Sequence, residues 1–393
     1  MKKPSAIVLA AGEGRRLRPL TEHRPKPMLP AAAKPILEHV FDELIEAGIA
    51  DITVVVGYGR HRVQSHFGPT YRNVPIRYVT QEKQLGSGHA LLAAESAVEA
   101  PALVVNGDQL VDRRIIEDVV DAHGNGDAAA TVGLTTRTDV SEYGGALLGE
   151  DGSLTDLVEN PCDDRDYRLN AGVYVLESAA FEAIRRAEPQ VGEHSLVDGL
   201  SELIDAGEPV RGVVSDGLWV DATYPWDLLE VADGVLKDER NVSSGVSPSA
   251  QIHESATVLG PVVVSADCVV GPSAVVGPNV CLGENVTVGA NATVEHSIVD
   301  ADTRIGSNAA LTDCVTGRGV RVGSGSTVVG GPGDVTVDDR VHQEERLGAL
   351  LADRVTDEGG VTYAPGSIVG SEAVVRAGTT VRGTVDSKTE VRS

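Results

Sequence analysis

A glycine-rich turn that directly follows a short apolar strand is the segment of this chain best suited to bind phosphate. The strand spans residues 6–10, and Gly12 and Gly14 in the turn allow the backbone to bend sharply and to approach a ligand closely. Successive backbone N–H groups in such a turn form a concave anion site. Arg15 and Lys26 add positive charge, so the segment suits the phosphates of a nucleotide.

The turn differs from two common phosphate-binding motifs. A Walker motif would end in Gly-Lys-Ser/Thr, and a dinucleotide-binding fingerprint would have a third glycine where this chain has Leu17. The structural alternative is a tight turn that joins a strand to a helix and binds nothing. The positive charges of Arg15 and Lys26 favour the functional interpretation.

Alternating strands and helices in the first half predict a mostly parallel, Rossmann-like sheet with helices on both faces. Apolar runs predict further strands at residues 52–56, 76–80 and 102–105, and helices at residues 35–47, 85–98 and 225–237. Ligands bind such sheets beyond the carboxyl ends of the strands. The glycine-rich turn and Asp108, which follows the fourth strand, are therefore expected at one edge of the sheet.

The second half has a different periodicity. An apolar residue recurs at every sixth position from Val246 to Val294, and a small or aliphatic residue follows four positions after each, from Ala250 to Ile298. Two inward positions per hexapeptide predict a parallel β-helix in which three hexapeptides form one coil. The phase slips after Ile298 and returns at Ile305. Residues 338–363 are expected to form an excursion, with a short helical turn near residues 344–351.

Length and composition bound the function. A chain of 393 residues suits two domains, expected at residues 1–240 and 246–393. A net charge of -25 and an aromatic content of 3% argue against nucleic-acid binding. No apolar stretch approaches the roughly 20 residues that span a membrane, and no signal peptide is evident, so we expect a cytoplasmic protein. The acidic surface suggests a halophilic source as a hypothesis, and an ordinary acidic protein is the alternative.

The two halves together resemble the sugar-1-phosphate nucleotidylyltransferases that carry a left-handed β-helix. The archaeal N-acetylglucosamine-1-phosphate uridylyltransferase, of the bifunctional acetyltransferase type, and glucose-1-phosphate thymidylyltransferase are the nearest types. The resemblance spans nearly the whole chain and implies an α/β nucleotidyltransferase domain followed by a left-handed parallel β-helix of hexapeptide repeats. It rests on motifs at residues 9–30, 81–90, 106–108, 143–145, 158–159, 169–172 and 217–227.

In this family an oxygen of the sugar-1-phosphate attacks the α-phosphorus of a nucleoside triphosphate, UTP or dTTP, and pyrophosphate leaves. The resemblance implies that Arg15 and Lys26 are catalytic and that Asp108 and Asp221 hold Mg²⁺. Positioning and charge neutralisation explain such catalysis without a protein nucleophile. The residues implied in nucleotide binding are Leu9, Ala11, Gly12, Gly14, Gln81, Gly86 and Ser87.

The sugar is expected to contact Gly144, Glu159 and Asn170, and it would be N-acetylglucosamine-1-phosphate or glucose-1-phosphate. Members of the family often have Lys after the glutamate, where this chain has Asn160, and Arg168 could supply the missing charge. Each residue also has a structural alternative: Asp108 could cap a helix, Gln81 could be a surface residue, and His89 is interpreted as a structural helix residue.

The β-helix of the family packs about a threefold axis, which predicts a homotrimer or a multiple of it. Bifunctional members carry a catalytic histidine in this domain, and this chain has Ser307 at that position. We therefore predict a scaffold without acetyl transfer. The alternatives are a bifunctional enzyme in which His296 or His342 serves as the base, and a non-catalytic regulatory homologue that binds nucleotide. The presence of Arg15 and Asp108 counts against the latter.

Overall fold

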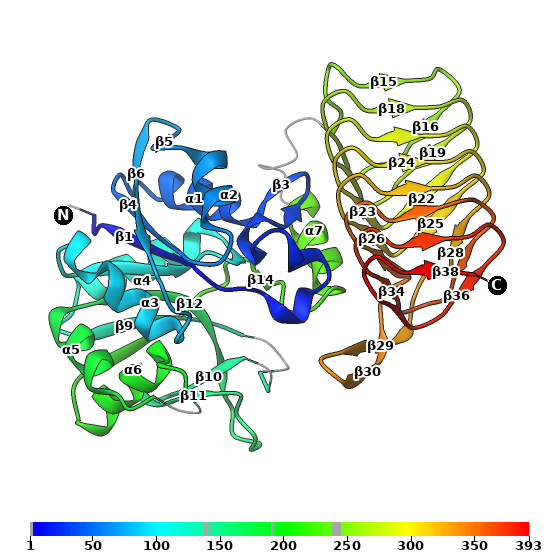
Figure 1. Ribbon diagram of the computed structural model, residues 1–393. Coiled ribbons are helices and arrows are strands. Elements are labelled where there is room, and N and C mark those ends of the chain that lie inside the picture. The colour runs from blue at the N-terminus through cyan, green and yellow to red at the C-terminus, as the bar shows by residue number, and fades with distance from the viewer. Residues whose placement is uncertain (1–2, 137–139, 142, 190–191, 238–244, 393) are drawn as a thin grey trace. The chain divides into compact units, whose positions relative to one another are not determined.

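A computed structural model describes residues 3–136, 140–141, 143–189, 192–237 and 245–392 of the chain (Figure 1). The chain divides into two compact units, and the segment after the first strand contributes to both. The first unit contains Met1–Glu13, Pro25–Met28 and Ile36–Trp219, and the second contains Gly14–Arg24, Leu29–Pro35 and Val220–Ser393. The expected domain boundary at residues 241–245 lies almost entirely outside the described residues.

A ten-stranded sheet forms the centre of the first unit. Strand β1 pairs in parallel with β4 on one side and with β7 on the other, and every residue of these runs except Asn106 is buried. In spatial order the strands are β11 (Leu154–Glu159), β10 (Gly144–Leu148), β12 (Arg168–Leu176), β7 (Ala102–Asn106), β1 (Ala6–Ala10), β4 (Ile52–Val56), β6 (Val74–Thr80) and β5 (Thr70–Tyr71), and β9 (Ala130–Thr135) joins β12 to β13 (Val210–Val214).

Helices cover both faces of this sheet, as the alternating pattern predicts. Ile7 and Leu9 of β1 pack with α3, α5 and α6, whereas Ala6 and Val8 face a second core that contains α1, α2 and α4. The predicted helix at residues 85–98 is shorter than expected. The helices are α1 (Ile36–Glu46), α2 (Arg60–Phe67), α3 (Ser87–Ala94), α4 (Arg113–Gly124), α5 (Ser178–Arg186) and α6 (Leu196–Asp205), with short 3-10 turns η3 (Lys26–Met28) and η4 (Glu95–Ala97).

The second unit is a left-handed parallel β-helix built from three stacked sheets (Figure 1). Each coil adds one short strand to each sheet, and the inward residues of successive coils form one apolar core, so the expected fold class is confirmed. The first sheet is β15 (Gln251–Ile252), β18 (Val269–Val270), β21 (Thr287–Val288), β24 (Arg304–Ile305), β27 (Arg321–Val322), β32 (Thr356–Asp357), β35 (Val374–Val375) and β38 (Glu390–Val391). The second is β16 (Thr257–Val258), β19 (Val275–Val276), β22 (Thr293–Glu295), β25 (Ala310–Thr312), β28 (Thr327–Val328), β33 (Thr362–Tyr363) and β36 (Thr380–Val381). The third is β17 (Val262–Val264), β20 (Val280–Leu282), β23 (Ser297–Val299), β26 (Cys314–Thr316), β31 (Ala349–Leu351), β34 (Ser367–Val369) and β37 (Thr384–Val385).

The slip in the hexapeptide phase comes from a shortened corner, and it corrects the prediction that Ile298 points inward. Val276 pairs with Val294, and Leu282 pairs with Val299, so the chain from Val294 to Val299 is one residue shorter than the equivalent segment of the preceding coil. Val299 therefore takes the inward position, and Ile298 is buried on the outer side of its strand.

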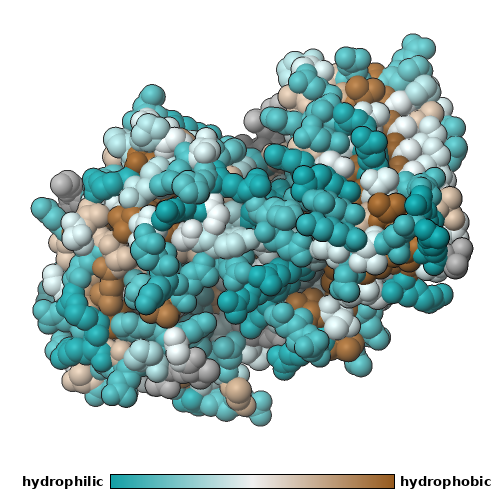
Figure 2. Space-filling model, in the orientation of Figure 1, coloured by the Kyte–Doolittle hydropathy of each residue, from teal (hydrophilic) through white to brown (hydrophobic). Residues whose placement is uncertain are grey.

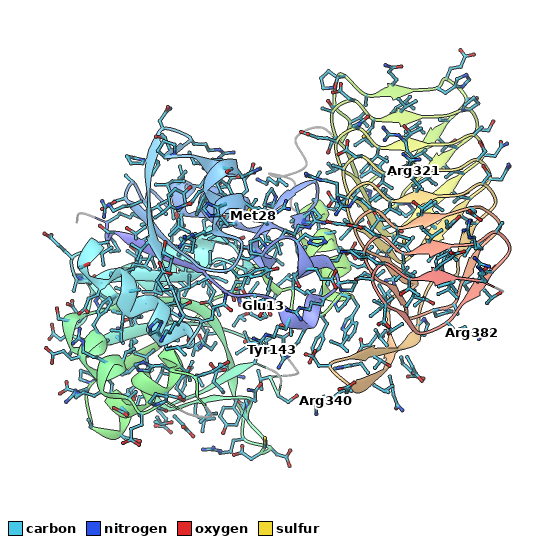
Figure 3. All side chains as sticks on the ribbon, in the orientation of Figure 1. Glu13, Met28, Tyr143, Arg321, Arg340 and Arg382 are labelled. Atoms are coloured by element: carbon cyan, nitrogen blue, oxygen red, sulfur yellow. The ribbon has the colours of Figure 1, made fainter. Side chains whose placement is uncertain are left out.

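The excursion is also shorter than predicted, and the expected helical turn at residues 344–351 is wrong. An antiparallel hairpin of β29 (Gly333–Val337) and β30 (Arg340–Glu345) leaves the β-helix, with Arg340 after its turn (Figure 3), and β31 already resumes the coil. The hexapeptide repeat could not be recognised here in the sequence, because Asp357 and Tyr363 occupy inward positions where an aliphatic residue is expected. The Tyr363 hydroxyl donates to Asp357 Oδ2 at 3.1 Å, which satisfies both groups inside the core.

Five further elements lie in the second unit: η1 (Arg15–Leu17), η2 (Leu20–Glu22), the paired strands β2 (Pro30–Ala31) and β3 (Lys34–Pro35), and α7 (Asp227–Lys237). The surface drawn in Figure 2 is mostly hydrophilic, as the net charge of -25 predicts. Among the described residues, no helix combines the length and apolar character that crossing a lipid bilayer requires.

Candidate active site

The beginning of the glycine-rich turn is held firmly in the first unit. The Leu9 carbonyl accepts a hydrogen bond from the N–H of Gly107 at 2.8 Å, and the Ala11 carbonyl accepts one from the Gln84 side chain at 3.0 Å. Gly12 is exposed, and a Cβ added there would meet no atom within 4 Å. The backbone at Gly12 therefore faces open space, which is what close approach of a ligand requires.

The second half of the turn belongs to the second unit. Gly14 has a φ of 69°, a conformation that glycine adopts without strain, and its carbonyl accepts a hydrogen bond from the Thr21 hydroxyl at 2.7 Å. This bond closes the segment into a compact loop that begins with η1. Arg15, the first residue of η1, has an exposed side chain. A guanidinium presented at such a turn can bind phosphate oxygens through two parallel hydrogen bonds.

Lys26 and Asp108 form an ion pair in the first unit. Lys26 begins η3, and its Nζ lies 3.0 Å from Asp108 Oδ2. The Lys26 side chain is 12% exposed and that of Asp108 is 34% exposed, so the carboxylate remains accessible while the ammonium is largely enclosed. Asp108 lies in the turn between β7 and β8 (Gln109–Val111), at the carboxyl end of β7, as the sequence predicts.

The second expected metal ligand, Asp221, ends β14 (Trp219–Asp221) in the second unit and accepts a hydrogen bond from the Thr223 hydroxyl. Among the described residues, no three His, Cys, Asp or Glu side chains form a group that could hold a metal by themselves. Mg²⁺ usually takes one or two carboxylates together with substrate phosphates and water. The half-exposed carboxylate of Asp108 fits that pattern, because it leaves room for such additional ligands.

Gln81, Gly86 and Ser87 lie close together, and a histidine supports them. The buried Gln81 amide is placed with Nε2 donating to the Gly86 carbonyl at 3.1 Å and lying 3.0 Å from His89 Nδ1. The Ser87 hydroxyl accepts a hydrogen bond from the N–H of Leu196 at 3.0 Å. His89, interpreted from the sequence as a structural helix residue, therefore orients the amide of Gln81. Its place eight residues after Gln81 in one motif was the available signal.

The three expected sugar-binding residues also come together. Gly144 of β10 is paired with Glu159 of β11, and a Cβ on Gly144 would lie 3.2 Å from the Asn170 side chain. Asn170 is fixed by two hydrogen bonds, from the N–H of Gly172 at 3.1 Å and to the Tyr174 hydroxyl at 2.8 Å. Glycine at position 144 thus leaves space beside the Asn170 amide.

The electrostatic surroundings of Glu159 raise its pKa. Desolvation of the carboxylate by the surrounding protein is the main cause of the higher pKa, and the carboxylates of Asp198 and Glu193 add to it. Such a carboxylate gains most from a partner that donates hydrogen bonds, and sugar hydroxyl and amide groups are donors of this kind.

Two side chains that the sequence did not single out hold the segment of Asn170 in place. Gln109 Nε2 and Trp219 Nε1 both donate to the Ala171 carbonyl, the latter at 3.0 Å. Gly172 has a φ of 65°, and a Cβ there would collide with the side chains of Asn106 and Gln109. Arg168, considered as a substitute for the lysine missing at Asn160, makes a double ion pair with Asp166, at 3.1 and 3.2 Å.

Comparison with known proteins agrees with both halves of the structure. Residues 5–238 match the model of the nucleotidyl transferase family, and residues 258–385 match a GMPPB C-terminal domain. "Bifunctional protein GlmU" of Methanococcus vannielii is 32% identical over 95% of this chain and 93% of its own length. Two Haloferax volcanii proteins are also similar. "UTP--glucose-1-phosphate uridylyltransferase AglF" is 35% identical over 60% of this chain and 97% of its own length, and "Low-salt glycan biosynthesis nucleotidyltransferase Agl11" is 34% identical over 81% and 93%.

Proposed function

Because the chain belongs to the nucleotidyl transferase family, we propose that it transfers a nucleoside monophosphate from UTP or dTTP to a hexose-1-phosphate and releases pyrophosphate. The observation that carries this proposal is the pairing of Lys26 with the half-exposed Asp108 at the carboxyl end of the sheet. The acceptor would be N-acetylglucosamine-1-phosphate or glucose-1-phosphate, and the name of the similar AglF protein mentions the second of these.

The residues would share the work by position and charge. Arg15 and the turn at Gly12 and Gly14 would bind the triphosphate and stabilise the leaving pyrophosphate, and Lys26 would contact the α-phosphate. Asp108 and Asp221 would hold Mg²⁺, which neutralises phosphate charge when bound. The sugar phosphate then attacks the α-phosphorus directly.

Base and sugar recognition would use the two preformed groups of side chains. Gln81, oriented by His89, would read the edge of a pyrimidine through its amide, next to the turn at Gly86 and Ser87, and Leu9 and Ala11 would line the nucleotide. Gly144, Glu159 and Asn170 would contact hydroxyl or N-acetyl groups of the sugar.

We also propose that the β-helix does not transfer acetyl groups. Hydrogen bonds to Asp233 and Asp313 raise the pKa of the buried His296 to about 9, so its imidazole is protonated near neutral pH and is a poor general base. His342 packs against the rings of Tyr224 and Trp226 at 4.6 and 5.1 Å. Release of CoA thiol from acetyl-CoA with glucosamine-1-phosphate or galactosamine-1-phosphate, abolished in His296→Ala or His342→Ala, would contradict this proposal.

The direct test of the main proposal is pyrophosphate release by the full chain, with UTP and dTTP each combined with both sugar phosphates and with Mg²⁺ present or chelated. The assay should be run at low and at molar salt, because the net charge of -25 makes a high-salt source a reasonable hypothesis. We expect nucleotide-sugar formation that depends on Mg²⁺. If the chain binds a nucleotide tightly but no combination of nucleotide and sugar phosphate is turned over, the regulatory alternative is favoured.

A further inference from the structure

The loop that carries Arg15 is part of the β-helix unit. Gly14–Arg24 belongs to the same unit as Val220–Ser393, although the chain reaches it from β1, a strand of the first unit's sheet. Within the loop, Leu17, Leu20 and Thr21 are buried, and the Thr21 hydroxyl is bonded back to Gly14. A displacement at the far end of this compact loop would therefore be carried to Gly14 and Arg15.

Arg24 ends the loop and fixes it to the β-helix. Its guanidinium is only 10% exposed and lies between two carboxylates, with Nη1 2.6 Å from Asp300 Oδ2 and Nη2 3.2 Å from Asp353 Oδ1. Burial alone would lower the pKa of Arg24, and the two carboxylates more than offset it, so the group stays charged. A buried cation held by two anions keeps a defined position far better than an exposed pair does.

The two carboxylates come from different coils, and the coil between them makes room for the bridge. Asp300 follows β23, Asp353 comes two residues after β31, and Gly317 follows the intervening β26. A Cβ on Gly317 would collide with the Asp353 side chain. Backbone hydrogen bonds orient both acids, from the N–H of Ala301 to Asp300 at 2.7 Å and from that of Arg318 to Asp353 at 2.9 Å.

Two further contacts hold the same loop. The Ser387 hydroxyl, two residues beyond β37, donates to the carboxylate of Glu22 at 3.1 Å. The guanidinium of Arg16 lies 5.5 Å from the centre of the Tyr224 ring, which is stacked on Trp226 and touches His342 of the hairpin. The loop is thus attached at Arg16, Glu22 and Arg24 to residues of the β-helix unit.

We propose that the β-helix positions the phosphate-binding loop through Arg24, so that Asp300 and Asp353 act as remote determinants of nucleotide affinity. This inference rests on the proposed function, in which Arg15 binds the triphosphate. Arg24 is a positioning residue, because it acts through the loop and is itself enclosed by the β-helix acids. On this proposal the β-helix influences nucleotide affinity in addition to serving as a scaffold.

The test compares Arg24→Gln, Arg24→Lys and Asp300→Asn/Asp353→Asn with a matched control, Arg376→Gln. Arg376 also bridges acids of different coils, Glu358 and Glu390, but it lies on the sheet of β35. We expect the KM for the nucleoside triphosphate to rise by about 10- to 100-fold in Arg24→Gln and in the double acid variant, because small misplacements of a binding group are costly. The KM of Arg24→Lys for the nucleoside triphosphate should lie between the values of these two variants and that of the wild type. In all of these variants the KM for the sugar phosphate should stay within about twofold of the wild-type value. The KM of Arg376→Gln for the nucleoside triphosphate should also stay within about twofold of the wild-type value.

Calorimetric titration with Mg²⁺-UTP and Mg²⁺-dTTP, without sugar phosphate, separates this inference from the proposed function. Nucleotide affinity that falls in the Arg24 and acid variants supports the inference even if no nucleotide sugar is formed. Wild-type affinity in a folded variant overturns it, and so does a wild-type protein that binds neither nucleotide. If Arg24→Gln does not fold, Asp353→Asn, whose side chain is 17% exposed, provides the same comparison.

Discussion

The Lys26 ammonium and the Asp108 carboxylate lie 3.0 Å apart at the carboxyl end of the central sheet, although 82 residues separate them in the sequence. The pair leaves the second carboxylate oxygen of Asp108 available for other ligands. A positive and a negative group that lie side by side could serve as partners for a phosphate and its cation.

Replacing Asp108 with Asn keeps the shape of the side chain and removes its charge. We expect turnover to fall by about a hundredfold or more, and the Mg²⁺ concentration for half-maximal activity to rise, because a ligand of the phosphate-bound cation is weakened. Lys26→Met should instead raise the KM for the nucleotide without changing the Mg²⁺ requirement. Equal effects of both substitutions on the Mg²⁺ requirement would argue that Asp108 serves only as the partner of Lys26.

The contact between Gln81 and His89 predicts a change in base selection. In His89→Leu the Gln81 amide loses the partner at 3.0 Å that orients it, so we expect a several-fold higher KM for the preferred pyrimidine nucleotide and weaker discrimination against ATP and GTP. His66→Leu, which alters a more exposed histidine paired with Glu38, is the control. Unchanged selectivity in steady-state competition assays would mean that the base is read elsewhere.

The sequence predicted the larger elements well because their signals are local. Buried strands such as β1 and β4 are continuous apolar runs, and the hexapeptide repeat places most inward residues of the β-helix without reference to anything distant. The motifs also named Gln81, Gly86, Gly144 and Asn170, which the structure brings together in two groups.

What the sequence did not predict depends on contacts between distant residues. The inward positions of Asp357 and Tyr363 look wrong for a repeat until the hydrogen bond between them is known. A one-residue deletion shifted Ile298 from the predicted inward position. Arg24 lies 276 residues before Asp300 in the chain, so no local pattern could reveal that the loop containing Arg15 is attached to the β-helix.

The charged group around His296 predicts an alkaline loss of stability. Hydrogen bonds to Asp233 and Asp313 raise the pKa of His296 to about 9. Burial opposes this shift, and so, to a smaller extent, does the charge of Arg346, which contacts Asp313 at 3.0 Å. Ionised His296 therefore stabilises the folded unit fully below ~6.5, the pKa of an unfolded histidine, and this stabilisation is lost as pH rises through about 9. Burial would raise the pKa of Asp313, but His296 and Arg346 hold it low, so its own contribution is lost only on acidification.

Melting temperatures of the wild type and His296→Gln, measured between pH 6 and pH 10, check this prediction. We expect the Tm of the wild type to fall steeply toward pH 10 and that of the variant to be lower at pH 6 and nearly flat. Ionised His296 contributes about 3 kcal/mol at most to the free energy of unfolding. His253→Gln, which alters an exposed histidine of the β-helix, should follow the wild type. Parallel curves for the wild type and His296→Gln would contradict the assignment.

The β-helix also predicts the assembly state. Its sheets expose apolar side chains such as Leu259 and Val269, and closed threefold symmetry would allow each copy to bury such surface against the next. Light scattering of the full chain in molar salt should give the mass of a trimer or of a multiple of it. A monomer at micromolar concentration would show that residues 246–393 do not serve as an assembly domain.

The most direct test of the central claim is exchange of labelled pyrophosphate into the nucleoside triphosphate. If a sugar phosphate attacks the α-phosphorus without a covalent enzyme intermediate, label should enter UTP or dTTP only when Mg²⁺ and the matching sugar-1-phosphate are both present. Exchange that proceeds without any sugar phosphate would contradict direct transfer, and a lack of exchange with every hexose-1-phosphate would contradict the proposed reaction itself.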